Sequence, residues 1–204
     1  MKNRNIQIII NIILVILEII GFILVIQEFG LKTLEYYTED SNFLLLVSSI
    51  IILIYLLSDR KLPSWLNGLR YVSIVSTTLT FIVVVTVLSW TTDWGLHYLL
   101  FEGSMLYHHT LCPLMALASF ILLEKYDGLN VLHGLTFTII YAIIMISLNV
   151  LKIVEGPYPF LLVYNQPVAV SILWTVIIFA ATYAIAFILK KVDLFSIFWL
   201  YLYI

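Results

Sequence analysis

The chain of 204 residues is 63% hydrophobic, with 11% charged residues and a formal net charge of −2. Soluble domains carry about 25% charged residues, so this composition excludes a soluble globular protein and predicts an integral membrane protein. The sequence also lacks the basic stripe and the motifs of nucleic-acid-binding proteins, so no nucleic-acid partner is expected. No polar stretch is long enough to fold separately, and residues 1–204 are expected to form a single transmembrane domain.

The apolar residues gather into six stretches, each long enough to cross about 30 Å of hydrocarbon as a helix. These stretches cover approximately residues 6–26, 41–58, 69–89, 103–123, 131–150 and 168–189. Turn-forming segments separate them, among them Asp127-Gly128 and Gly156-Pro157-Tyr158-Pro159. The first stretch is too long for a signal-peptide core and is expected to be retained. The pattern predicts an all-α, multi-pass bundle of six transmembrane helices.

The positions of lysine and arginine predict the orientation of this bundle. With the N-terminus in the cytoplasm, eight of the ten basic residues fall on the cytoplasmic side, namely Lys2, Arg4, Arg60, Lys61, Arg70, Lys125, Lys190 and Lys191. Cytoplasmic loops carry an excess of basic residues, so both termini are expected to be cytoplasmic. Residues 192–204 are too short to span again, and their aromatic content is typical of an interfacial tail.

Polar residues open the second apolar stretch. Thr38, Ser41 and Asn42 are spaced i, i+3, i+4, so they share one face if the helix begins before Thr38. Their hydrogen-bonding groups would then converge at the outer end of the bundle. The alternative is an N-terminal cap, a role that suits Asp40 or Ser41.

Two adjacent histidines, His108 and His109, lie near the start of the fourth stretch. Neighbouring residues of a helix point about 100° apart, so the two rings are expected to face different neighbours. Glu102 is seven residues before His109 and would lie on nearly the same helix face. Burying an ionisable ring in hydrocarbon costs several kcal/mol unless the ring has a partner. The pair therefore indicates either a functional site or structural hydrogen bonding.

Two further polar residues lie within apolar stretches. Glu18 is in the middle of the first stretch, with Asn11 one heptad before it on the same face. A carboxyl group at that depth is either protonated and hydrogen-bonded or part of a functional site. In the fifth stretch, Asn149 shares a polar stripe with Thr138 and Tyr141, which favours helix packing or a supporting role in a site.

The segments Tyr37-Thr38, Ser41-Asn42-Phe43-Leu44 and His108-His109-Thr110-Leu111-Cys112-Pro113-Leu114 resemble the androgen-induced-gene family of six-pass membrane hydrolases and its prokaryotic relatives. In that family a threonine at the start of the second span is the nucleophile and a histidine in the fourth span is the base. Its substrates are fatty acid esters of hydroxy fatty acids. The resemblance implies Thr38 as nucleophile and His109 as base, with no cofactor and no metal.

The chemistry of the residues is compatible with that role. A threonine hydroxyl needs a base to take its proton, and imidazole suits this task. Ser41 or Asn42 could donate to an oxyanion, Glu102 or Glu18 could orient the imidazole, and His108 and Asn149 would support the site or bind substrate. The expected partners are the bilayer and a lipid or acyl-ester substrate.

Two other classes of function fit parts of the sequence. A transporter, a ligand sensor or a structural membrane protein would account for Glu18 and Asn11 without catalysis. A metal-dependent membrane hydrolase would use residues expected on one side of the membrane: His97, Glu102, His108, His109, Asp40 and Asp93. The sequence has no HExxH or comparable metal motif, and it carries no signal for an oligomeric state.

Overall fold

The computed structural model describes residues 2–124 and 129–202, with side chains for residues 4–124 and 129–192. The regular structure in this part of the chain is helical. It contains six helices that are long and apolar enough to cross a membrane: Arg4–Phe29, Tyr37–Leu57, Ser64–Thr91, Gly103–Leu123, Val131–Val150 and Val168–Val192. The protein is therefore a multi-pass integral membrane protein with an all-α six-helix bundle, as the sequence predicts.

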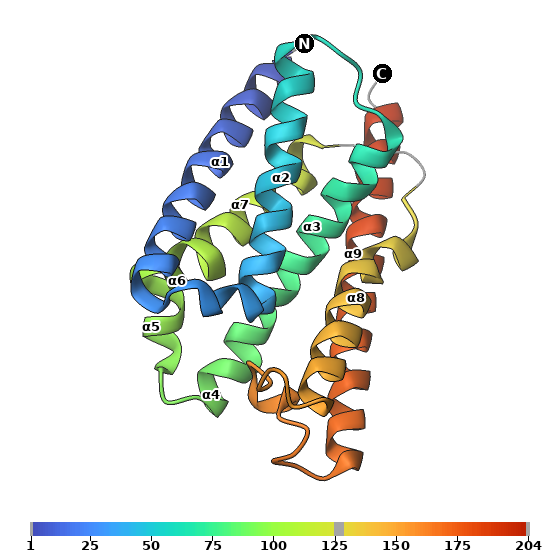
Figure 1. The fold of residues 1–204 in the computed structure, drawn as a ribbon. Helices are drawn as coiled ribbons and strands as arrows, with labels where there is room; N and C mark the ends of the chain where they lie inside the picture. The colour runs from blue at the N-terminus through green and yellow to red at the C-terminus, as the bar shows by residue number, and fades with distance from the viewer. Residues whose placement is uncertain (1, 125–128, 203–204) are drawn as a thin grey trace.

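The chain runs up and down between the two ends of this bundle (Figure 1). The elements in chain order are α1 (Lys2–Phe29), a 3₁₀ turn (Leu31–Glu35), α2 (Tyr37–Leu57), α3 (Ser64–Val83), a π-helical turn (Val84–Leu88), α4 (Ser89–Thr91), α5 (Gly95–Phe101), α6 (Gly103–Met105), a π-helical turn (Leu106–Leu111), α7 (Cys112–Leu123), α8 (Val131–Val150), a 3₁₀ turn (Pro159–Leu161) and α9 (Val168–Leu202). Both termini lie at one end, and α2 begins at the other.

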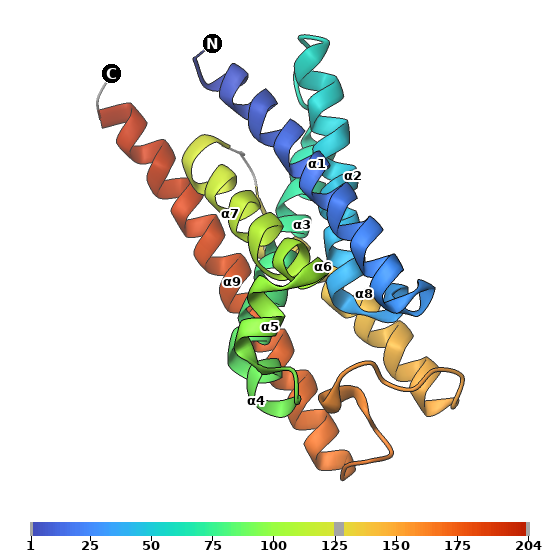
Figure 2. The ribbon, with the colours of Figure 1, turned by 90° about the vertical axis from the view of Figure 1, so that its left-hand side faces the viewer.

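Helix α3 is the centre of the bundle. It packs against α2, α7, α8 and α9, and 56% of its most apolar stretch is buried, compared with 22% for α8 and α9. Its hydroxyl-bearing residues Ser73, Ser76 and Thr77 are fully buried. Figure 2 shows α7 between α1 and α9 on another side of the bundle. Polar side chains thus face neighbouring helices, while α8 and α9 expose many aliphatic side chains to the surroundings.

The second and fourth spans differ from the simple helices that the sequence predicts. Helix α2 begins at Tyr37, four residues before the predicted start of the span at residue 41. The fourth span begins with the short α6 and continues through the π-helical turn Leu106–Leu111 into α7, which has Pro113 in its first turn. Proline has no N–H and its ring crowds the preceding turn, so the regular hydrogen-bond ladder cannot continue through this position. Both differences decide where Thr38 and His109 point.

Two other predictions concern the connectors and the tail. The Asp127-Gly128 turn lies outside the described residues. The predicted interfacial tail, residues 192–204, is not a separate element, because α9 continues without a break to Leu202. No glycine or proline interrupts the sequence after Lys190, so nothing there ends the helix.

Candidate functional site

The second and fourth spans meet at Thr38 and His109. Thr38 lies in the first turn of α2, and its Oγ1 is 3.4 Å from Nε2 of His109. Both side chains are buried, with 4% of each residue exposed. This separation is somewhat long for a hydrogen bond, but catalytic hydrogen bonds often tighten only when substrate is bound. The structure thus brings together the two residues that the resemblance singles out.

A backbone carbonyl orients the His109 ring. Nδ1 is 2.8 Å from the carbonyl oxygen of Leu99, near the end of α5. A carbonyl only accepts hydrogen bonds, so Nδ1 carries the proton in this contact and Nε2 of the neutral ring presents its lone pair to Thr38. The hydroxyl of Thr110 donates to the next carbonyl, that of Leu100, at 2.8 Å. Two consecutive contacts therefore hold the π-helical turn against α5.

Tyr158 completes the polar end of the site. It belongs to the connector between α8 and α9, yet only 7% of it is exposed. Its hydroxyl accepts a hydrogen bond from the backbone N–H of Thr38 at 3.2 Å and lies 3.4 Å from Thr38 Oγ1. Burial, followed by the charge of nearby Glu39, raises the pKa of Tyr158 above its ordinary value. The hydroxyl therefore stays protonated at neutral pH and can donate a hydrogen bond.

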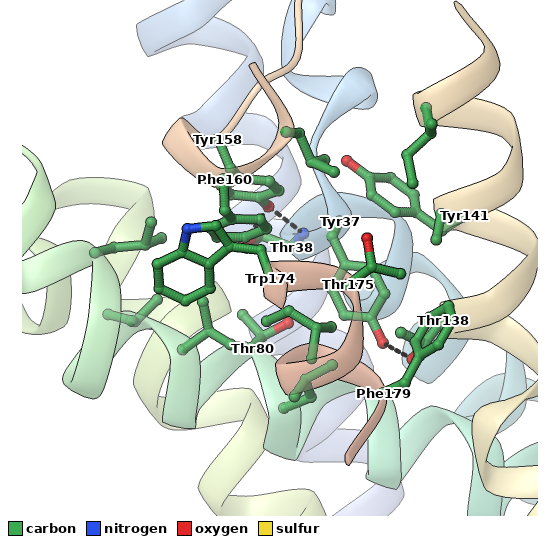
Figure 3. Close-up of a pocket in the computed structure, with 18 residues that line it drawn as sticks. Tyr37, Thr38, Thr80, Thr138, Tyr141, Tyr158, Phe160, Trp174, Thr175 and Phe179 are labelled. Carbon is green, nitrogen blue, oxygen red and sulfur yellow. Dashed lines mark hydrogen bonds between the residues drawn. The ribbon is translucent and has the colours of Figure 1, made fainter. Parts of the chain in front are cut away.

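Thr38 and Tyr158 stand between two cavities. One has a volume of about 330 Å³ and is also lined by His109 and Glu39. The other is narrower, about 60 Å³, and lies among α3, α8 and α9. Figure 3 shows the narrower cavity, with Tyr158, Phe160 and Trp174 on one side and Tyr37 with its hydrogen bond to Thr138 on the other. Its lining is mostly aliphatic and aromatic, so it suits a hydrocarbon chain.

Ser41 and Asn42 do not face these cavities. Ser41 Oγ is 3.0 Å from the Thr38 carbonyl oxygen, to which it donates, and 3.0 Å from Thr80 Oγ1. Asn42 donates to the carbonyls of Thr38 and His108. Both side chains are fully buried against these partners and neither lines a cavity, so neither is placed to donate to an oxyanion as expected. The capping alternative is also wrong, since α2 begins at Tyr37 and its N-cap position is Tyr36, with no side-chain cap.

The two histidines face different neighbours, as predicted. His108 points toward α1, where its Nε2 is 3.5 Å from Glu18 Oε2 and its ring contacts Phe22. Glu18 is fully buried and lies beside His108. The prediction that Glu18 orients the base therefore does not apply to His109, whose Nδ1 is engaged by the Leu99 carbonyl.

Glu102 and Asn149 are also placed differently from the expectation. Glu102 has an extended backbone before Gly103, so it is not on the helix face of His109. It is about half exposed and pairs with His97 at 3.1 Å. Asn149 donates to the Val154 carbonyl and accepts from the Val163 N–H. It holds the connector that carries Tyr158 and does not line either of the two cavities.

The metal-dependent alternative has no ligand set in the part of the chain that the structure describes. There, no three histidine, cysteine, aspartate or glutamate side chains are grouped so as to hold an ion. His97 and Glu102 lie at the surface, away from the buried pair His108 and His109.

Sequence reasoning missed three contributors to the site. The Leu99 carbonyl carries no sequence signal at all. Glu39 was part of the polar run at the start of the second span, but its burial depends on the early start of α2. The sequence places Tyr158 only in a predicted turn, but its position between Pro157 and Pro159, in a stiff segment, is a signal that points to it.

The comparisons with known proteins add no assignment. No family model, no curated protein and no solved structure matches the chain. The resemblance to the androgen-induced-gene family therefore rests on the short segments around Thr38 and His109 alone.

Proposed function

We propose that the protein is an intramembrane hydrolase of lipid esters that uses Thr38 as nucleophile and His109 as general base. The observation that carries this proposal is the buried contact between Thr38 Oγ1 and His109 Nε2 at the edge of a cavity. An alcohol is a weak nucleophile until a base takes its proton, and this geometry presents a ring lone pair to the hydroxyl.

The reaction would proceed in two halves. Thr38 Oγ1 attacks the ester carbonyl carbon while His109 Nε2 takes the hydroxyl proton. The tetrahedral intermediate collapses to an acyl-threonine, and the alcohol leaves with the proton that His109 returns. A water molecule, deprotonated by His109, then attacks the acyl-threonine, and His109 returns that proton to Thr38 Oγ1 as the fatty acid leaves. The Tyr158 hydroxyl donates a hydrogen bond to the oxyanion that forms in both halves.

The surroundings of the pair favour a lipid substrate. The narrow cavity adjoining Thr38 and Tyr158 is lined mainly by hydrocarbon and aromatic groups, so it would take an acyl chain. Thr38 lies in the first turn of α2, and that helix begins away from the end of the bundle that holds the termini (Figure 1). With both termini cytoplasmic, as the basic residues predict, the reaction would take place toward the outer leaflet, in the cell membrane if the protein is prokaryotic. Fatty acid esters of hydroxy fatty acids are the substrate class that the resemblance adds.

The test uses the purified full-length protein in detergent micelles with a long-chain acyl ester. Thr38→Val keeps the shape of the side chain but removes the hydroxyl, and His109→Gln removes the base. Both variants are expected to abolish turnover, whereas Thr38→Ser should retain it. Thr86→Val is the matched control, since that hydroxyl only donates to the Ile82 carbonyl of its own helix. Full activity of either Thr38→Val or His109→Gln would exclude that residue from the mechanism.

A further inference from the structure

A second polar cluster lies beside the proposed catalytic pair and uses different residues. The imidazole of His108 stands between two carboxyl groups from separate helices. Its Nε2 is 3.5 Å from Glu18 Oε2 of α1, and its Nδ1 is 3.8 Å from Glu39 Oε1 of α2. The side chains of His108, Glu18 and Glu39 are 1%, 0% and 6% exposed. A carboxyl, an imidazole and a second carboxyl thus lie in a row inside the bundle.

The hydrogen-bonding capacity of this row is left unused. Within the described residues, neither ring nitrogen of His108 has a hydrogen-bond partner, and the carboxyl oxygens of Glu18 have only the Cys112 thiol as a weak donor beside them. Buried polar groups are nearly always hydrogen-bonded, so such a group requires an explanation. The two nitrogen-to-oxygen distances exceed the length of an ordinary hydrogen bond by less than about 1 Å. Small side-chain rotations would therefore join the three groups.

Few other titratable groups face the row. On the side of Glu18, the Cys112 thiol of α7 lies close and Arg70 of α3 acts through its charge. Arg70 itself is paired with Glu124 through two hydrogen bonds. On the side of Glu39, the nearby groups are Tyr36, Asp40, Tyr141 and Tyr158, and His109 is the next residue along the chain from His108.

The contacts that the row can make depend on how many protons the three groups share. A neutral imidazole has one N–H and one lone pair. With both carboxyls ionised, one of them would face that lone pair, and two electron-rich atoms would be buried against each other. One additional proton removes this conflict, either as a carboxylic acid facing the lone pair or as an imidazolium facing two carboxylates. In both forms the row carries a net charge of −1 and satisfies each contact.

We infer that Glu39, His108 and Glu18 form a proton relay that links the cavity to the buried interior of the bundle. The O–H bond of protonated Glu39 breaks as its proton passes to Nδ1, and the Nε2–H bond breaks as that proton passes to the Glu18 carboxylate. The new bonds are Nδ1–H and the O–H of Glu18. Neither the number of protons nor the charge changes, so the step needs no further reactant.

One end of the relay reaches a cavity, and the other end is buried inside the bundle. Glu39 lines the larger cavity, whereas Glu18 is fully buried in the middle of α1. Gly21 makes the close approach of α1 and the Leu106–Leu111 turn possible, because a Cβ there would overlap the His108 ring. A proton that enters from the cavity is therefore stored inside the membrane. This inference does not depend on the proposed hydrolysis, because it uses neither Thr38 nor the ring of His109.

The test measures protons directly, with no need for a substrate. The full-length protein, labelled with nitrogen-15 in its histidine rings, is studied in micelles at neutral pH by NMR. The His108→Asn variant identifies the His108 signals. Infrared spectroscopy detects the carbonyl stretch of a protonated carboxyl group. The wild type is expected to show that band and to have both His108 nitrogens partly protonated.

Three variants separate a relay from a structural role. Glu18→Gln and Glu39→Gln should each remove the carboxylic acid band and fix His108 in one tautomer, because an amide can donate where the acid did. Gly21→Ala should push the His108 ring out of the row without removing any titratable group, so His108 should hold a single tautomer while the buried Glu18 keeps the acid band. Gly68→Ala is the control, with open space at its Cβ position. A wild-type protein that lacks the band and holds His108 in a single neutral tautomer, or a band that survives in either glutamine variant, would overturn the relay.

Discussion

Replacing Tyr158 by phenylalanine removes one oxygen atom from the candidate site. The ring can keep its position, because Tyr158 stacks on Phe160 with centroids 5.1 Å apart and an interplanar angle of 7°. The hydroxyl has two neighbours in the site, the backbone N–H and Oγ1 of Thr38. The substitution therefore separates the role of this oxygen from the packing of the connector.

The two contacts of the hydroxyl set the expected magnitudes. Loss of an oxyanion donor costs about 100-fold to 1,000-fold in kcat, or roughly 3 to 4 kcal/mol of transition-state stabilisation. The N–H of Thr38 also loses its acceptor. Thr38 lies in the first turn of α2, where no carbonyl of the same helix can replace that acceptor. An unsatisfied buried donor costs about 1 to 3 kcal/mol, so Tm should fall as well.

The assay compares kcat and KM for a long-chain acyl ester in micelles, alongside the thermal unfolding midpoint. Because the oxyanion forms only in the transition state, kcat should fall while KM changes little. Tyr164→Phe is the matched control, since its hydroxyl donates to the Val150 carbonyl and it is exposed. Wild-type kcat in Tyr158→Phe, with a normal Tm, would refute the assignment of Tyr158 as the oxyanion donor.

Three further predictions concern Tyr158, Asn149 and Glu102. The pKa of Tyr158 is raised in the folded protein, so above pH about 10 the unfolded chain loses this proton first and the free energy of unfolding should fall as pH rises. In denaturant titrations at several alkaline pH values, the free energy of unfolding of Tyr158→Phe should fall less steeply with pH than that of the wild type. The same dependence on pH in both proteins would contradict the buried hydroxyl. Asn149→Ala removes two hydrogen bonds to the connector and should lower the free energy of unfolding by about 2 kcal/mol. Proteolysis within residues 151–167 should be faster and kcat lower. Unchanged proteolysis would show that Asn149 does not hold the connector. Glu102→Gln removes a half-exposed ion pair and should change the free energy of unfolding by less than about 1 kcal/mol without affecting hydrolysis. A large loss of turnover in this variant would show that Glu102 takes part in the site.

The fold follows from the sequence because membrane spans have a strong local signal. Each of the six spans needs about 20 apolar residues, and that requirement can be read without knowing any neighbour. The different facing of His108 and His109 could also be predicted, since adjacent helical residues always diverge. The short segments single out Thr38 and His109, but their contact depends on the early start of α2 and on the π-helical turn, which the sequence does not report.

The rest of the site depends on irregular backbone that local patterns do not report. The π-helical turn before Pro113 and the extended backbone at Glu102 changed which residues share a face. The Leu99 carbonyl and Tyr158 enter the site through the folding of connectors. Their positions depend on contacts between segments far apart in the sequence, such as Thr38 with Tyr158, and periodicity carries no information about such contacts.

The most direct test of the central claim is the mass of the protein during turnover. The purified protein is mixed with an acyl ester, quenched in acid within one turnover, and digested for mass spectrometry. An acyl group on the peptide that contains Thr38 is expected, absent in Thr38→Val and strongly reduced in His109→Gln. Hydrolysis without any acylated peptide, or acylation at another residue, would contradict the account.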